Sequence, residues 1–527
     1  MLHHCAVSAL LFHGGRVHVG DGRSATALLA RDGLVVGLGA PDELRRQSPS
    51  AEAVDLRGGL MVPGLVDAHV HFMWWSLQLA QLDLRDEPTI DAALARIATR
   101  VGGLPEGAWL GGGRFDKNLW GRWPTAAELD RVTGGHPAAL RSRDGHARWL
   151  NTAALRLAGI TRATPDPSGG ALVRDADGDP TGILKENASR LADAVVPSPT
   201  EDECLVAVRH GQEQAWRRGL TGIEDFEQGS ARRAFTSLDE RGQLGLRVSM
   251  GIPHGDLDEA LGQGSRTGLG GAWLRVGHLK IFTDGALGSQ TAALEEPYEG
   301  THDRGILTID EGTLCADVAR AARAGIAVAI HAIGDRAVHV ALEAIAPTRA
   351  RAPGLRQKIE HVQLVRADDL GRFAALGIVA SMQPLHATSD RDLADRHWGA
   401  ARTARAYPWR TLLASGARLA FGSDAPVEPI DPLAGIHAAV ARRRPGEATA
   451  WHSEQRLTLT EALAGYAAGS AWAFGRENEL GTLALGMCAD ATILDRDAFA
   501  VHDEELPGVG IAGTMTGGVI RFSDGLG

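Results

Sequence analysis

The clearest pattern of apolar and polar positions lies in residues 61–71, Met-Val-Pro-Gly-Leu-Val-Asp-Ala-His-Val-His. An apolar run becomes an alternation in which Asp67, His69 and His71 share one face of an extended chain and the apolar residues share the other. This pattern predicts a buried strand that ends in two imidazoles able to chelate one metal ion. Taken alone, the same residues also fit a half-buried strand with two hydrogen-bonded histidines.

From about residue 200 to residue 473, short apolar runs alternate with alanine-rich amphipathic stretches such as 314–324 and 336–346. This alternation is typical of an α/β protein with a parallel sheet or barrel. Together with the strand before His69 there are eight predicted strands, the number in a TIM-type (β/α)8 barrel, whose active site lies at the carboxyl ends of its strands. The other seven are residues 219–225, 244–252, 274–283, 326–331, 358–361, 377–382 and 418–422.

The ends of the chain and one internal segment depart from this rhythm. Residues 1–62 and 478–527 consist of short strands separated by Gly and Asp, and each set is too small to be stable alone. We therefore expect one discontinuous small β-sandwich built from both termini. Residues 83–199, rich in Gly, Pro and Trp, predict an inserted α+β lobe that covers the active site. The barrel itself would comprise residues 63–82 and 200–477.

Composition excludes several classes of partner. The 527 residues carry 54 Lys and Arg against 65 Asp and Glu, a net charge of −11 without a basic block, so nucleic acid is not an expected partner. The four cysteines are far apart and are expected to be reduced thiols. No apolar run reaches the roughly 18 residues of a membrane span, and the amino terminus lacks the pattern of a signal peptide. We expect a cytoplasmic protein that does not bind membranes.

Residues able to bind metal ions recur at the predicted strand ends. His331 and His361 each finish an apolar strand, Asp424 follows the last one, and Lys280 lies within another. Each alone has an ordinary explanation: a capped histidine, an aspartate at a helix start, or a lysine that reaches solvent. With the His69 and His71 strand, five strand ends carry such residues, which indicates one site for a divalent ion such as Zn²⁺.

The motifs resemble those of the metal-dependent amidohydrolase superfamily, specifically amidohydrolase family 3, which includes N-substituted formamide deformylase. The resemblance covers nearly the whole chain. It rests on the segments 63–71 (PGLVDAHVH), 143–146 (RDGH), 179–186 (DPTGILKE), 280–289 (KIFTDGALGS), 331–336 (HAIGDR), 359–361 (IEH), 381–384 (SMQP), 422–424 (GSD) and 486–490 (GMCAD).

The resemblance implies a ligand set. His69 and His71 would bind a first metal ion, His331 and His361 a second, and Lys280, as an N-carboxylate, would bridge the two. Asp424 would bind the first ion and act as the proton acceptor. An ammonium group cannot ligate a cation, so a lysine at such a site must be displaced, neutral or carboxylated. One-metal members exist, so the count of one or two ions per chain stays open.

Five other residues are candidates for substrate contacts. His146 and Asp144 belong to the 143–146 motif of the lobe, Gln383 and His386 follow the seventh strand, and Trp75 comes soon after His71. Each also has a structural explanation, because histidines inside a lobe and tryptophans between two packed units are common.

The predicted activity is hydrolysis of a C–N bond in an amide, an N-substituted formamide or a cyclic amide, by a metal-activated hydroxide with Asp424 as general base and acid. Ester or lactone hydrolysis on the same site is the near alternative. A redox metalloenzyme fits a His, Asp and carboxylated lysine site poorly, and a non-catalytic metal-binding protein is the third class. The expected partner is a small amide-type substrate, and homodimers are common among relatives.

Overall fold

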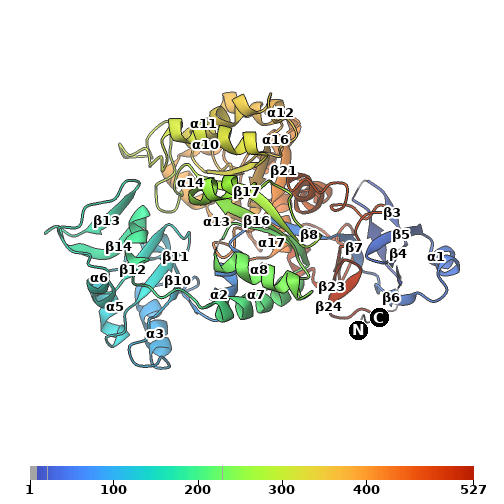
Figure 1. Cartoon of the computed structure of the whole chain (residues 1–527), viewed down its shortest axis with the longest axis horizontal. Helices are drawn as coiled ribbons and strands as arrows, with labels where there is room; N and C mark the ends of the chain where they lie inside the picture. Colours follow the sequence, from blue (N-terminus) through green and yellow to red (C-terminus); the bar gives the residue numbers. More distant parts are fainter. Residues whose placement is uncertain (1–8, 21, 228) are drawn as a thin grey trace.

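The computed structural model describes residues 9–20, 22–227 and 229–527. Three parts follow one another along the longest axis of the molecule (Figure 1). An inserted lobe lies at one end and an α/β barrel lies in the centre. Two small sheets, formed by the N-terminal and C-terminal segments of the chain, lie at the other end.

The central sheet has eight strands whose neighbours all pair in parallel. Its spatial order follows the order in the sequence, which is the arrangement of repeated βα units in a TIM-type barrel. The predicted α/β class and eight strands are confirmed. The strands are β8 (Leu65–Val70), β15 (Leu220–Asp225), β16 (Arg247–Pro253), β17 (Leu274–Phe282), β18 (Val328–Ala332), β19 (Lys358–His361), β20 (Val379–Met382) and β21 (Arg418–Phe421).

Four of these strands (β15, β16, β18 and β20) begin one to three residues later than predicted, two of them for evident local reasons. Residues 244–246 precede β16 because the Gly245 N–H donates to the Gln212 side chain, 2.7 Å away, rather than to a neighbouring strand. Gly377 is not in β20 because it caps the preceding helix in the left-handed conformation, with φ +60°.

Helices and loops surround the strands, and the alanine-rich stretches form helices. The helix α10 (Glu311–Ala324) begins after Asp310, whose side chain accepts the Thr313 N–H, and ends at Gly325 with φ +81°. Other helices of the barrel are α2 (Phe72–Gln78), α7 (Glu201–Trp216), α8 (Ser230–Glu240), α9 (Leu257–Gly262), α11 (Asp335–Ile345), α12 (Arg372–Leu376), α16 (Trp409–Ala414), α17 (Pro432–Ala441) and α18 (Leu459–Ala464).

The first and last barrel strands meet mainly at their carboxyl ends. The Asp424 N–H donates to the His69 carbonyl and the His71 N–H donates to the Ala425 carbonyl, both at 2.8 Å. The Asp67 carboxylate accepts the Ser423 N–H at 2.9 Å. A Cβ atom at Gly422 would lie 2.6 Å from both Asp67 Oδ1 and the His69 nitrogen, so only glycine lets the two segments approach this closely.

The segment between β8 and α7 forms a mixed six-stranded sheet with its own apolar core, which includes Phe115 and Trp149. Its strands are β9 (Leu82–Asp83), β10 (Gly112–Phe115), β11 (Ala139–Ser142), β12 (Ala147–Leu150), β13 (Gly170–Arg174) and β14 (Pro180–Glu186). Its helices are α3 (Ile90–Val101), α4 (Lys117–Trp120), α5 (Ala126–Thr133), α6 (Thr152–Leu157) and the 3₁₀ helix η1 (Asn187–Ala192).

The chain ends are joined within one sheet, since β7 (Leu60–Pro63) pairs antiparallel with β22 (Ala491–Leu494). The same sheet contains β2 (Arg16–His18), β3 (Ser24–Ala25), β23 (Ile511–Thr516) and β24 (Val519–Ser523). A four-stranded sheet contains β1 (Leu10–His13), β4 (Ala27–Arg31), β5 (Leu34–Gly39) and β6 (Glu52–Asp55). One apolar cluster, which includes Phe12, Met61 and Ile493, draws on both sheets.

Along the described chain, no helix combines the length and apolar character needed to cross a membrane.

The contact around Gly422 generates a stability prediction. Gly422→Ala should cost about 1–3 kcal/mol, because the new methyl group overlaps the backbone of β8. The midpoint of urea or thermal unfolding should fall measurably. Gly354→Ala is the matched control, since a Cβ there meets no atom within 4 Å. Equal midpoints for both variants would show that the close approach at Gly422 carries no energetic weight.

Candidate active site

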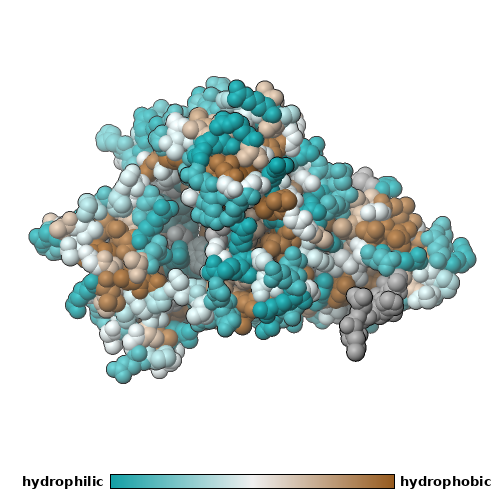
Figure 2. Space-filling view, viewed as in Figure 1, coloured by the Kyte–Doolittle hydropathy of each residue, from teal (hydrophilic) through white to brown (hydrophobic). Residues whose placement is uncertain are grey.

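A cavity of about 1020 Å³ lies at the carboxyl ends of the barrel strands and extends to the lobe. The molecular surface is recessed between these two parts (Figure 2). The cavity draws residues from many barrel loops and from the strands β10, β11, β12 and β14 of the lobe. The sequence-predicted residues that line it are His69, His71, Asp144, His146, Lys280, His331, His361, His386 and Asp424.

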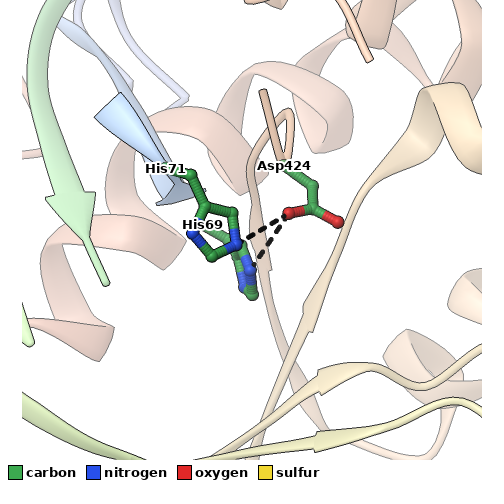
Figure 3. Close-up of side chains that lie close together, drawn as sticks. All are labelled: His69, His71 and Asp424. Carbon is green, nitrogen blue, oxygen red and sulfur yellow. Dashed lines mark ion pairs between the residues drawn. The ribbon is translucent and has the colours of Figure 1, made fainter. Parts of the chain in front are cut away.

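Asp424 lies at the centre of the histidines. Its Oδ1 is 3.3 Å from His69 Nε2 and 3.5 Å from His71 Nε2, and Figure 3 shows both imidazoles turned toward this oxygen. Its Oδ2 is 3.9 Å from His386 Nε2 and 4.0 Å from His361 Nδ1. Each oxygen therefore forms, with two histidines, a group of three donor atoms within 4.8 Å of one another.

The local backbone places these side chains at the strand ends. Asp424 and His361 have φ of +57° and +72°, a left-handed conformation that is unusual for residues other than glycine. The turn at Asp424 is fixed by Asp67, whose carboxylate holds both the N–H and the hydroxyl of Ser423. Asp67 thus orients the turn that carries Asp424, and backbone strain of this kind is concentrated at functional sites.

His331 and Lys280 complete the cluster on its other side. The His331 ring centre is 4.5 Å from that of His361, and its Nε2 is 3.2 Å from the Gly285 carbonyl oxygen. Lys280 Nζ lies 3.3 Å from His69 Nε2, between the rings of Phe226 and Phe282. The structure therefore brings together all six residues of the predicted ligand set.

Burial dominates the electrostatics of this cluster. It lowers the pKa of His71 to about 3 and those of His69, His331 and His361 well below the usual value, and the Lys280 charge lowers them further. Burial also lowers the pKa of Lys280 to about 8 and raises that of Asp424 to about 7. The imidazoles are thus neutral at pH 7, which is the form that binds metal ions.

The donor set fits a divalent metal ion. Neutral imidazoles and a carboxylate are the ligands of Zn²⁺ and similar ions. His386 Nε2 is buried without a hydrogen-bond partner while it faces Asp424, an arrangement that is costly unless another group is bound there. Lys280, buried among imidazoles, has no carboxylate within ion-pair distance in the described structure.

A row of fully buried charges supports the cluster from inside the barrel. His69 Nδ1 is 2.7 Å from a Glu360 carboxylate oxygen, which fixes the orientation of the imidazole. Lys358 Nζ lies 2.8 Å from Glu360 and 2.6 Å from Glu224, and Glu224 is 2.7 Å from His278 Nδ1. Lys358 also donates to the Ala68 carbonyl at 2.9 Å. The first ligand is therefore held by a chain of ion pairs that crosses the barrel.

The lobe reaches the cluster through His146. Its ring centre is 5.7 Å from that of His331, and its Nδ1 is 2.8 Å from Glu186 Oε2. Burial alone would lower the pKa of His146, but Glu186 raises it to about 9. Glu186 also accepts from Thr291 of the barrel at 2.6 Å, so this pair joins the lobe to the barrel.

Two of the expected substrate contacts lie elsewhere. Trp75 does not line the cavity but packs in the barrel core, with its ring centre 5.3 Å from that of Phe72, whereas the neighbouring Trp74 lines the cavity. The reason is that both residues lie on α2, where adjacent positions point to different sides. Gln383 does not line the cavity either, and its Oε1 lies 2.8 Å from His361 Nδ1.

Several residues of the site had no role in the sequence analysis. Glu360, Lys358 and Glu224 were unassigned, although charged residues two apart in the short predicted strand 358–361 are a signal that one strand face lines a barrel interior. Arg141 and Glu227 also line the cavity. Nothing in their local sequence marks them, because the fold alone brings β11 and the loop after β15 to the barrel mouth.

An eight-stranded parallel barrel with His, Asp and Lys at its carboxyl ends defines the class of metal-dependent hydrolases. The sequence profile of the amidohydrolase family matches residues 52–522, so the chain belongs to this family. It is similar to YtcJ of Bacillus subtilis, with 33% identity over 97% of this chain and 99% of that protein. It is 28% identical to the N-substituted formamide deformylase of Arthrobacter pascens, over 97% of this chain and 98% of the relative.

A solved structure described as an uncharacterized metal-dependent hydrolase from Pyrococcus horikoshii superposes with a TM-score of 0.77 at 28% identity. The match covers 94% of this chain and 99% of the other. The barrel, the histidine and aspartate cluster and the relatives agree on a metal-dependent hydrolase.

The buried row of charges generates the second prediction. Lys358→Met leaves Glu360 and Glu224 buried without their common cation, and removing one partner of such a network costs about 3–5 kcal/mol. The unfolding midpoint should fall strongly. Adding Glu224→Gln to this variant should recover part of the loss, since one uncompensated charge is removed. An unchanged unfolding midpoint in Lys358→Met would show that these ion pairs do not contribute to stability.

Proposed function

We propose that this protein hydrolyses a C–N bond in an amide, an N-substituted formamide or a cyclic amide. The observation that carries the proposal is the position of Asp424, whose carboxylate contacts His69 and His71 through one oxygen and faces His361 and His386 through the other. The similarity to N-substituted formamide deformylase supports the choice of bond.

His69, His71 and Asp424 would hold one ion, since two imidazoles and a carboxylate are ligands of Zn²⁺. His331 and His361 would hold a second. When bound, such an ion supplies Lewis acidity, which polarises a carbonyl group and lowers the pKa of water. Lys280 would bridge the ions after its neutral amine adds to CO₂ and loses a proton, which gives a carbamate. The lowered pKa of Lys280 favours the neutral amine that this reaction needs.

Asp424 moves the proton in this proposal. Its carboxylate accepts a proton from the attacking water, and a C–O bond forms at the carbonyl carbon. The same carboxyl group then gives the proton to the leaving nitrogen, and the C–N bond breaks. A carboxylate buried beside the reacting atoms is suited to accept this proton and to return it to the nitrogen.

His146 would orient the substrate from the lobe. Its Nδ1 is engaged with Glu186, so the other ring nitrogen is left for a substrate oxygen. Asp144 lies on the same turn, where its Oδ1 accepts the His146 N–H at 3.0 Å, and its role would be to fix that turn. The lobe would thereby cover the site and select a small amide-type substrate.

The metal centre has a direct test by elemental analysis. We expect about two divalent ions per chain in protein loaded in the presence of bicarbonate, and at most one in Lys280→Met, because the bridging carbamate is lost. A ¹³C resonance of a carbamate should appear with labelled bicarbonate in the native protein only. Lys185→Met, a lobe variant with the same change of charge, is the control. One ion per chain and no carbamate signal in the native protein would contradict the bridged pair.

The role of Asp424 has a kinetic test. Asp424→Asn should retain the fold but lower kcat by about 10²- to 10⁴-fold, the contribution of a positioned acid–base group. The variant is compared with the native protein at equal measured metal content, on amides, N-substituted formamides and cyclic amides. A native kcat in a fully loaded Asp424→Asn protein would contradict the mechanism.

A further inference from the structure

Arg141 stands out among the charged residues of the cavity, because its guanidinium has no anionic partner in contact. Its Cζ lies 5.1 Å from the centre of the Trp74 ring, and across the described residues it makes no side-chain hydrogen bond or ion pair. Arg143, two residues later, shows the usual arrangement, with Nη2 2.6 Å from Glu428. A partly buried guanidinium whose five N–H donors meet no protein acceptor is able to bind an anion.

A second arginine lies directly across the lobe sheet. Arg148 on β12 is the register partner of Arg141 on β11, lines the same cavity and is only 7% exposed. Its Nη2 is 2.6 Å from Asp193, but its Nη1 is buried with no hydrogen-bond partner. Like charges opposite one another in a sheet are destabilising, and a buried unpaired donor adds to that cost. The fold therefore places two arginines, Arg141 and Arg148, opposite one another on the cavity wall at a cost in electrostatic energy.

The charges near this pair leave room for one anion. Arg141, Arg148, Asp193 and Glu227 line the cavity. Asp193 is paired with Arg148, which leaves Arg141 without a carboxylate in contact. Glu227 is already engaged, since its Oε2 accepts the Trp74 N–H at 2.9 Å. One unpaired guanidinium suits a single carboxylate, which it can bind through two parallel N–H donors.

The wall is adjacent to the proposed reaction centre. The Trp74 ring is next to both Arg141 and His71, with its centre 5.9 Å from that of the His71 imidazole. It also packs against Gly145 of the 143–146 motif, where a Cβ would lie 2.9 Å from the indole. The indole thus holds the guanidinium beside the histidine cluster, so one small molecule can reach both.

We propose that Arg141, with Arg148 behind it, binds the carboxylate of the substrate, and that the preferred substrates are N-acylated amino acids. This inference rests on the proposed function for the bond that is cut, and it adds the charged group by which the substrate is selected. Trp74 provides an apolar face next to the carboxylate, and Arg141 binds it through two parallel N–H donors. Arg141 is the specificity-determining residue.

The test compares an acid with its neutral counterpart on the zinc-loaded protein. N-benzoylglycine and N-benzoylglycinamide share the same scissile bond, and benzoate release reports its cleavage. Arg141→Met should lower kcat/KM for the acid by about 10- to 150-fold, the worth of hydrogen bonds to a charged group, mainly through KM. The value for the amide should change less than twofold, and Arg141→Lys should recover part of the loss for the acid.

Arg156→Met is the matched control, because Arg156 is exposed on α6 of the same lobe and its loss changes the net charge equally. Equal losses for the acid and the amide in Arg141→Met would assign Arg141 to the stability of the lobe and would overturn the proposal. Competition by inorganic phosphate stronger than that by acetate would overturn the choice of a carboxylate.

A binding measurement separates this inference from the proposed function. Calorimetric titration with N-benzoylglycine, N-acetylglycine and glutarate needs no turnover. Binding that is tighter than for the corresponding amides, and is lost in Arg141→Met, would support the anion subsite even if no C–N bond were cleaved. If the native protein binds none of the three acids more tightly than its amide, the subsite does not exist, whatever hydrolytic activity is found.

Discussion

The structure depends on the hydrogen-bonded contact between the first barrel strand, β8, and the turn after the last strand, β21. Asp67 holds the Ser423 turn, and the backbone of residues 424 and 425 bonds to that of residues 69 and 71. These hydrogen bonds bring both ends of the sheet together and, in the same contact, place the Asp424 carboxylate between two imidazoles. Gly422 makes the approach sterically feasible. The same hydrogen bonds therefore close the sheet and position the Asp424 carboxylate.

The interior of the barrel is built to hold ionised groups, not only apolar ones. Glu360, Lys358 and Glu224 are fully buried, yet each has partners at 2.6–2.8 Å. Buried ion pairs seldom add stability over an apolar core, so their value here is positional. Glu360 holds the His69 imidazole from inside the barrel, and the hydrogen bond from the Asp424 N–H fixes the His69 backbone. A ligand held in this way needs little rearrangement to bind a metal ion.

The lobe contributes groups of a different kind. Its His146 and Glu186 pair contacts the histidine cluster and the barrel loops, while β11 and β12 bring cations to the cavity wall. In the proposed function, the barrel supplies the reacting centre and the lobe supplies the groups that select the substrate. This division is usual in barrels, where substrate specificity changes through the loops at the carboxyl ends of the strands.

The sequence by itself determined the eight barrel strands and the six residues of the central cluster. Both signals are local: the apolar periodicity sets each strand, and a ligand residue ends or interrupts it, as at His331 and His361. Other features depend on residues far apart in the chain and were decided only by the tertiary structure. Whether Trp74 or Trp75 faces the cavity depends on how α2 is rotated about its own axis against the barrel. Arg141 and Arg148 are neighbours because β11 and β12 of the inserted sheet pair in this register. No local pattern encodes such contacts, because their energies arise only when distant segments pack.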